Sequence, residues 1–127
     1  MTEDEIAKII VQAAYNVHVQ LGPGLLESAY EACLVFELND LGLNVASQVN
    51  LPINYRGVYL ECGGYRIDIL VEGKVIVEIK SVSELSNVHL AQTLTYLKLT
   101  DCKLGLLINF NVTRIKDGIK RVIKGNL

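Results

Sequence analysis

The sequence predicts a single α+β or α/β domain in which helices flank a central mixed β-sheet. The chain has 127 residues, which fits one ordinary domain, and half of them are hydrophobic, which is enough to form a core. Apolar residues recur at helical spacing near the start and again late in the chain, whereas the segments between show strand-like alternation or short continuous apolar runs. These patterns give the element order ααββββαβ.

Two helices are expected to open the chain. The first covers residues 2–21, because Thr2 is a cap-like residue before an acidic turn and apolar residues then follow at helical spacing. The motif LGPG at 21–24 ends it, since proline and glycine do not continue a helix cheaply. A second helix is expected over 25–41, with Gly42 as a left-handed cap. Its apolar residues occupy most of its circumference, which predicts burial on several sides.

The remaining elements follow from a change of period after Gly42. Strands are expected at 44–55, 58–62, 65–71 and 74–81, followed by a helix at 87–99. The run KLGLLINF at 103–110 is continuously apolar, which indicates a strand buried on both faces. Residues 111–127 give a weaker signal, typical of a short final strand or helix.

Three charged residues interrupt the most apolar hairpin of the chain: Asp68, Glu78 and Lys80. Glu78 and Lys80 are two apart on a strand and therefore face the same side. Whether Asp68 joins them depends on the turn, because a two-residue loop would place it opposite Val77 on the other face. Gly73 favours a three-residue loop, which contains a left-handed position, so we expect the shared face.

That three-residue loop is expected at residues 71–73, which pairs Leu70 with Lys74 and Asp68 with Ile76. Asp68 would then lie diagonal to Glu78, roughly 7–8 Å away at Cα, close enough for both side chains to reach one cation. This register is a direct test of the site described next.

Two adjacent buried carboxylates repel each other, and one is protonated unless a cation intervenes. A hard divalent ion such as Mg²⁺, or Mn²⁺ in its place, accepts oxygen ligands and keeps several waters. Lys80 could orient or deprotonate one such water, so the three residues predict metal-assisted hydrolysis of a phosphodiester. The structural alternative is an acid–lysine ion pair at a strand end.

Two further motifs accompany this cluster. The segment GLLESAY contains Gly24, Glu27 and Tyr30 at the spacing GxxExxY, and QTLTY contains Gln92 and Tyr96 at the spacing QxxxY. Together with Asp68 and the Glu-x-Lys element, these motifs resemble the GxxExxY family of the PD-(D/E)xK nuclease superfamily. The resemblance covers residues 6–110.

The resemblance implies a restriction-endonuclease-like core and a nuclease activity, with DNA as the expected substrate. Asp68 and Glu78 then correspond to metal ligands and Lys80 to the catalytic lysine. Glu27 corresponds to a helical carboxylate that approaches the metal directly or through water. Gln92 and Tyr96 match a motif that lines the active site beside the substrate. The classical motif begins with proline before the aspartate, whereas here Ile67 precedes Asp68.

Several nearby residues have both structural and functional interpretations. Gln92 and Tyr96 share a helix face with His89, and the structural alternative to an active-site role is that this face is a packing surface. Tyr30 is one turn from Glu27 and could brace that helix. His18 reads more readily as a half-buried structural histidine, although its closeness to LGPG could bring it to the site.

The charge distribution and the cysteine content limit the possible binding partners and the cellular compartment. The formal net charge is −2, and the acidic side chains gather early in the chain, up to Asp40. The basic residues of the final segment could contact phosphates or form a solvated face: Arg114, Lys116, Lys120, Arg121 and Lys124. The three cysteines are far apart and form no metal motif, which favours a reducing cytoplasmic setting. No apolar run reaches membrane-spanning length.

Three functional hypotheses follow from these observations. The first is a metal-dependent nuclease, for which a homodimer would place two sites on the two strands of a duplex. The second is a non-catalytic nucleic-acid- or protein-binding module that keeps the nuclease fold. The third is a stable scaffold that merely contains a polar cluster.

Overall fold

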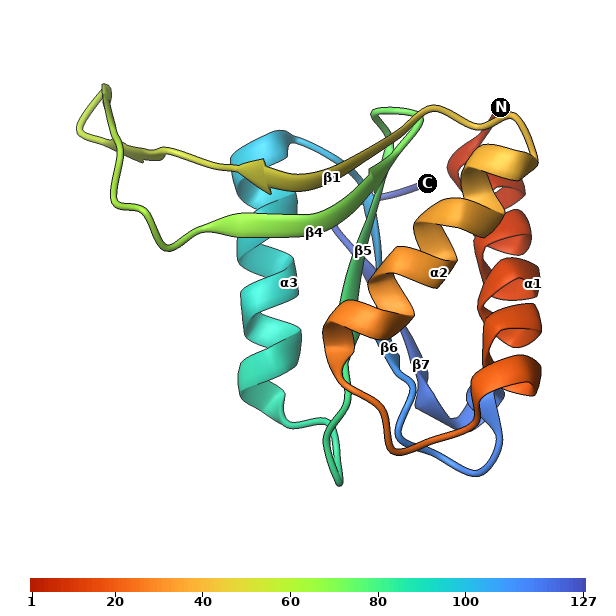
Figure 1. Ribbon diagram of the computed structural model, residues 1–127. Helices are drawn as coiled ribbons and strands as arrows, with labels where there is room; N and C mark the ends of the chain where they lie inside the picture. Colours follow the sequence, from red (N-terminus) through yellow and green to blue (C-terminus); the bar gives the residue numbers. More distant parts are fainter.

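The computed structural model describes residues 1–127 and shows a five-stranded mixed sheet with helices on both faces (Figure 1). The spatial order of the strands is β1-β4-β5-β6-β7, and β5 and β6 form the parallel pair at the centre. Helices α1 and α2 lie on one face and α3 lies on the other (Figure 1). The predicted fold class is therefore confirmed. No helix is long and apolar enough to cross a membrane.

The helices begin and end close to the predicted positions: α1 spans Glu3–Leu21, α2 Glu27–Asp40 and α3 Asn87–Thr100. Thr2 and Glu5 form a capping box at the start of α1. Gly42 has a φ of 82°, as the predicted left-handed cap after α2 requires.

The prediction that α2 is buried on several sides is wrong. Only Tyr30, Leu34 and Leu38 of this helix are buried. Phe36 is 70% exposed, and Leu26, immediately before the helix, is 78% exposed. The reason is that α2 packs beside α1 on one sheet face and has no element covering its outer side.

The strand predicted over 44–55 is two strands. β1 covers Val45–Asn50 and β2 covers Ile53–Tyr55, and the break falls at Pro52, which has no N–H to donate to a ladder. β2 pairs with β3, Val58–Leu60, in a separate hairpin that projects away from the main sheet (Figure 1). The weak final segment contains a 3₁₀ turn, η1 at Ile115–Gly118, and an edge strand, β7 at Ile119–Ile123.

The register of the hairpin formed by β4, Arg66–Val71, and β5, Val75–Lys80, differs from the predicted one. Val71 pairs with Val75 and Leu70 pairs with Ile76, so Leu70 does not pair with Lys74. The loop has three residues, as predicted, but begins one residue later because Glu72 as well as Gly73 adopts a positive φ. The resulting shift of two residues preserves the alternation of faces.

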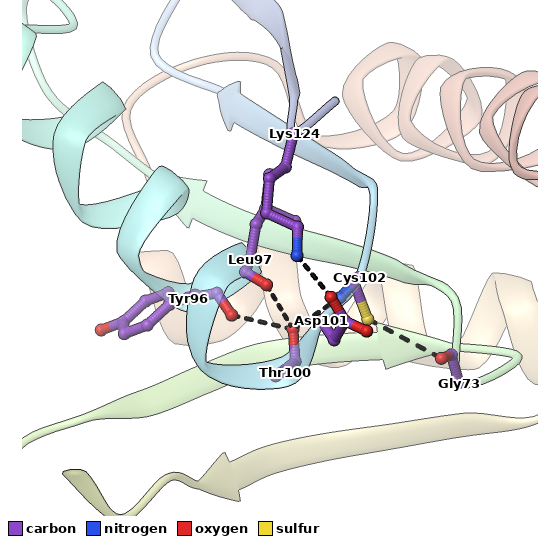
Figure 2. A network of polar contacts seen from close by, with 7 residues as sticks. All are labelled: Gly73, Tyr96, Leu97, Thr100, Asp101, Cys102 and Lys124. Carbon is purple, nitrogen blue, oxygen red and sulfur yellow. Dashed lines mark hydrogen bonds and ion pairs between the residues drawn. The ribbon is translucent and has the colours of Figure 1, made fainter. Parts of the chain in front are cut away.

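Helix α3 is fixed against the sheet at two places. Gly105 of β6, Leu104–Asn109, allows close approach, because a Cβ there would lie 2.9 Å from Thr93 Cγ2. At the end of the helix, Thr100 Oγ1 donates to the Tyr96 carbonyl, and Cys102 Sγ donates to the Gly73 carbonyl in the β4–β5 turn (Figure 2). These contacts position Tyr96 relative to the hairpin that carries the acidic residues.

Candidate active site

Asp68 and Glu78 lie where the paired part of the β4–β5 hairpin ends. The last backbone pair is Ile69 with Val77, which leaves Asp68 and Glu78 as the next positions on the two strands. Glu78 Oε2 accepts a hydrogen bond from the Asp68 N–H at 2.9 Å, and Asp68 Oδ2 accepts one from the Ile79 N–H at 2.8 Å. Each carboxylate is therefore held by the backbone of the opposite strand, and the predicted shared face of the two residues is confirmed.

Burial makes ionisation of both carboxyl groups more costly. Burial, followed by the negative charge of Asp68, raises the pKa of Glu78 to about 8. Burial also raises the pKa of Asp68, and the charge of Glu27 adds to that effect. Without a cation beside them, the pair therefore retains a proton at pH values where isolated carboxyl groups have lost theirs.

Lys80 follows Glu78 on the same side of β5 and is half-buried. Its positive charge lowers the pKa of both Asp68 and Glu78, so it lies within electrostatic reach of the pair. Yet neither of the molecule's two ion pairs, Arg121 with Asp4 and Lys124 with Asp101, involves it. The alternative of a simple acid–lysine ion pair is therefore not what the structure contains.

Glu27 is the first residue of α2 and approaches the end of β5. Its Oε1 accepts a hydrogen bond from the Ser81 N–H at 3.3 Å, while Ser81 Oγ donates to the Leu25 carbonyl at 2.6 Å. The charge of Glu27 raises the pKa of Asp68, so it lies within electrostatic reach of the pair, although no three acidic, histidine or cysteine side chains lie close enough together to hold one ion. The structure thus brings Asp68 and Glu78 together and leaves Glu27 at the edge.

The QxxxY residues are on the α3 face that looks toward the hairpin. Tyr96 is buried and makes an edge-to-face contact with Tyr65, with ring centroids 6.3 Å apart. Burial and then the charge of Glu78 raise the pKa of Tyr96, so its hydroxyl is near the acidic pair. Gln92 is half-buried one turn earlier. His89, by contrast, serves a capping box with Ser86.

Tyr30 and His18 have structural contacts. The Tyr30 hydroxyl donates to the Gly22 carbonyl and accepts from the Leu25 N–H, which braces the loop before Glu27. Its ring stacks on Phe110 at 4.5 Å. His18 is buried, and its Nε2 donates to the Val112 carbonyl at 2.8 Å.

Sequence reasoning missed two supports of the site. Asn109 is buried at the end of β6, and its amide bonds both the N–H and the carbonyl of Val82, which fixes the chain just after Lys80. Gln48 donates to Glu31 at 2.7 Å on the other side of Asp68. The position of Asn109 at the end of a continuously apolar run was the available signal, whereas nothing in the sequence marks Gln48.

Comparison with known proteins gives one family match and a similar solved structure. Residues 4–122 match the family model described as the PD-(D/E)XK nuclease superfamily. Among solved structures, the chain is similar to the one described as "Crystal structure of SSO0001", with a TM-score of 0.56 and 18% sequence identity. That match covers 96% of this chain and 79% of the other. No curated protein matches significantly.

Proposed function

Since the chain belongs to the PD-(D/E)XK nuclease superfamily, we propose that it is a divalent-metal-dependent nuclease that cleaves phosphodiester bonds, with DNA as the expected substrate. The observation that carries this proposal is the buried pair of Asp68 and Glu78 with Lys80 beside it on the same face but outside ion-pair distance. The intact GxxExxY motif supports placing the chain in the GxxExxY branch.

The donor chemistry of the pair fits a Mg²⁺ or Mn²⁺ ion. Mg²⁺ is commonly held by one or two carboxylates together with waters and substrate phosphates, so Asp68 and Glu78 suffice as protein ligands. In each of them one oxygen is fixed by a backbone N–H of the opposite strand. A divalent cation at this position would supply a Lewis acid for the phosphoryl oxygens. It would also offset the burial and the neighbouring negative charges that raise the two pKa values.

The chain's own residues divide the remaining work. Lys80, free of an ion pair, orients or deprotonates the attacking water. Glu27 acts through water at the edge of the site, in keeping with the absence of a cluster of three ligand side chains. Gln92 and Tyr96 contact the substrate from α3.

A cleavage assay tests this proposal. Linear, nicked and single-stranded DNA and single-stranded RNA are incubated with the protein in Mg²⁺, in Mn²⁺ and in excess chelator. Cleavage is expected with either metal and not with chelator. Lys74→Ala provides a matched control for Lys80→Ala, because Lys74 lies at the other end of the same hairpin, exposed to solvent.

Absence of cleavage on every substrate, with nucleic-acid binding retained, would instead support the non-catalytic binding module. Absence of both would leave only a folded scaffold. Cleavage that persists at full rate in Lys80→Ala would contradict the assigned site.

We also propose a homodimer, since one site reaches one strand and a two-fold axis would place two sites on antiparallel strands. The projecting β2–β3 hairpin supports an interface, because Tyr55, Val58 and Leu60 on one of its faces are about half exposed or more. Light scattering at working concentration is expected to give twice the mass of the chain. A monomer at all concentrations would contradict the dimer without touching the nuclease proposal.

A further inference from the structure

A cavity of about 430 Å³ lies on the other side of the loop that precedes Glu27. It is formed by the end of α1, the Gly22–Pro23 turn and the segment between β6 and η1. Its lining residues include no carboxylate; they are Tyr15, His18, Val19, Gly22, Pro23, Thr113, Arg114, Ile115 and Lys116. The cavity is therefore a positively charged hollow in a protein whose formal net charge is −2.

The structure separates the basic residues of the final segment into two groups. Arg121 and Lys124 form ion pairs with Asp4 and Asp101, so their charges are already compensated. Arg114 and Lys116 have no ion-pair partner, are exposed, and both line the cavity. Their positive charges are thus available to a ligand.

The cavity lies where α1 ends, beside the loop that leads to Glu27. The loop at residues 22–26 runs along this end between α1 and α2, next to the segment after β6 and the segment after β5 (Figure 1). One side of that loop is bound to the catalytic region through Leu25 and Ser81, and its Gly22–Pro23 turn lines the cavity. A single loop therefore separates the basic cavity from the residues beside Glu27.

Hydrogen bonds fix two walls of the cavity in place. His18 is buried and fixed to the Val112 carbonyl, which holds the segment before Arg114 against α1. The loop wall is fixed from the opposite side by the Tyr30 hydroxyl through Gly22 and Leu25. Tyr15, 53% exposed, adds an aromatic surface beside the two cations. Cations next to an exposed aromatic ring are the combination that binds a nucleic-acid strand without sequence preference.

We propose that this cavity, through Arg114 and Lys116, binds a backbone phosphodiester of the substrate strand away from the bond that is cleaved. This inference rests on the proposed nuclease function and adds the path of the substrate to it. The strand crosses the loop at 22–26, with one phosphate at the acidic pair and a more distant one in the cavity.

The experiment measures binding of a fluorescent oligonucleotide, single-stranded and duplex, by anisotropy across a range of KCl concentrations in chelator. Chelator prevents metal-dependent cleavage during the titration. The test variant is Arg114→Ala with Lys116→Ala. The control is Lys103→Ala with Lys120→Ala, which removes the same charge from exposed lysines outside the cavity. Thermal melting checks that both variants are folded.

If the cavity binds phosphate of the strand, the test variant binds about fivefold or more weakly at moderate salt than the control. The slope of log Kd against log salt also falls by about 0.7 for single strands and 0.9 for duplex, because the test variant loses the contact to the one phosphate held in the cavity. Equal affinities and slopes in the two variants would overturn the proposal. A second result would also overturn it. Inorganic phosphate would raise the melting temperature of the wild type but not of the test variant, while the two variants bind the oligonucleotide equally well.

The same preparations separate this inference from the proposed function. If the wild type cleaves nucleic acid and the two variants have equal salt slopes, the proposed role of the cavity is rejected and the proposed nuclease activity is retained. If the test variant has a reduced slope and the wild type does not cleave, the proposed nuclease activity is rejected and the nucleic-acid-binding role of the cavity is retained.

Discussion

The β4–β5 hairpin has two halves that differ in chemistry although they share one backbone. Near the turn, Ile69, Val71 and Val77 pair and pack into the main core with no exposed surface. Beyond the Ile69–Val77 pair, the carboxylates of Asp68 and Glu78 accept the N–H groups of the opposite strand. The first half stabilises the fold, and the second places charge in a buried position at a cost that a stable scaffold would not need.

Removing the Lys80 amine beside the acidic pair is the strongest test of the difference between the two halves of the hairpin. Lys80→Ala is expected to reduce cleavage by about 10²–10⁴-fold, the range typical of a lost acid–base group, while leaving the Kd for nucleic acid nearly unchanged. The melting temperature should hold, since Lys80 forms no ion pair. Steady-state cleavage and anisotropy on one preparation make the measurement. A parallel loss of binding and cleavage would mean that Lys80 only attracts the substrate.

The paired half should respond in the opposite way. Ile69→Ala is expected to lower the free energy of unfolding by about 2–5 kcal/mol, because the side chain is fully buried and leaves a cavity. Urea denaturation measures the change. Val122→Ala is a useful control, since Val122 lies on the edge strand and is only half-buried. A smaller loss at Ile69 than at the edge would break the division of the hairpin into a stabilising half and a functional half.

In chelator, the polar half should make stability fall as pH rises. The folded pKa of Glu78 is about 8 and its ordinary value is 4.5, so between these values the folded state binds more protons than the unfolded state. The stabilisation from this group is therefore fully present at and below about pH 4.5, decreases toward pH 8, and does not change further above it. The raised pKa of Asp68 acts in the same direction. Glu78→Gln should flatten the curve measured by thermal melting. A wild-type curve that rises over this range would contradict the buried pair.

The smallest expected effect concerns Tyr96. Tyr96→Phe keeps the ring that contacts Tyr65 and removes only the hydroxyl near Glu78, so the melting temperature should change little. Loss of one hydrogen bond to the substrate is worth about 1 kcal/mol, which predicts roughly a fivefold decrease in cleavage. Unchanged cleavage would assign Tyr96 to packing alone. Tyr65→Phe serves as the control on the opposite ring.

Much of this architecture could be predicted because its signals are local. Thr2, Gly42 and the apolar periodicity mark the helices directly, and the Glu78-x-Lys80 spacing fixes a shared face whatever the fold. The exact pairing of Asp68 could not be predicted, because it depends on which residues of the turn adopt positive φ. The exposure of Phe36 was missed for a different reason, since an apolar helix face does not reveal whether another element exists to cover it.

The supports of the site are less predictable still. Asn109 and Gln48 act on Val82 and Glu31, which are distant in sequence, so only the assembled sheet brings them together. The same is true of the Gly73 contact that ties α3 to the hairpin (Figure 2). Motif spacing therefore predicted which residues form the candidate site, and tertiary contacts determine where they lie.

The central claim is that the polar half of the hairpin is a divalent-cation site, and Mn²⁺ titration by calorimetry tests it most directly. Wild-type protein is expected to show a saturable binding event. The accompanying gain in stability should be about 1.4 kcal/mol at a free metal concentration of roughly ten times Kd. Asp68→Asn should lose both the heat and the stabilisation, whereas Asp40→Asn, an exposed acid at the end of α2, should retain them. No saturable heat in the wild type, or equal heat in wild type and Asp68→Asn, would contradict the claim.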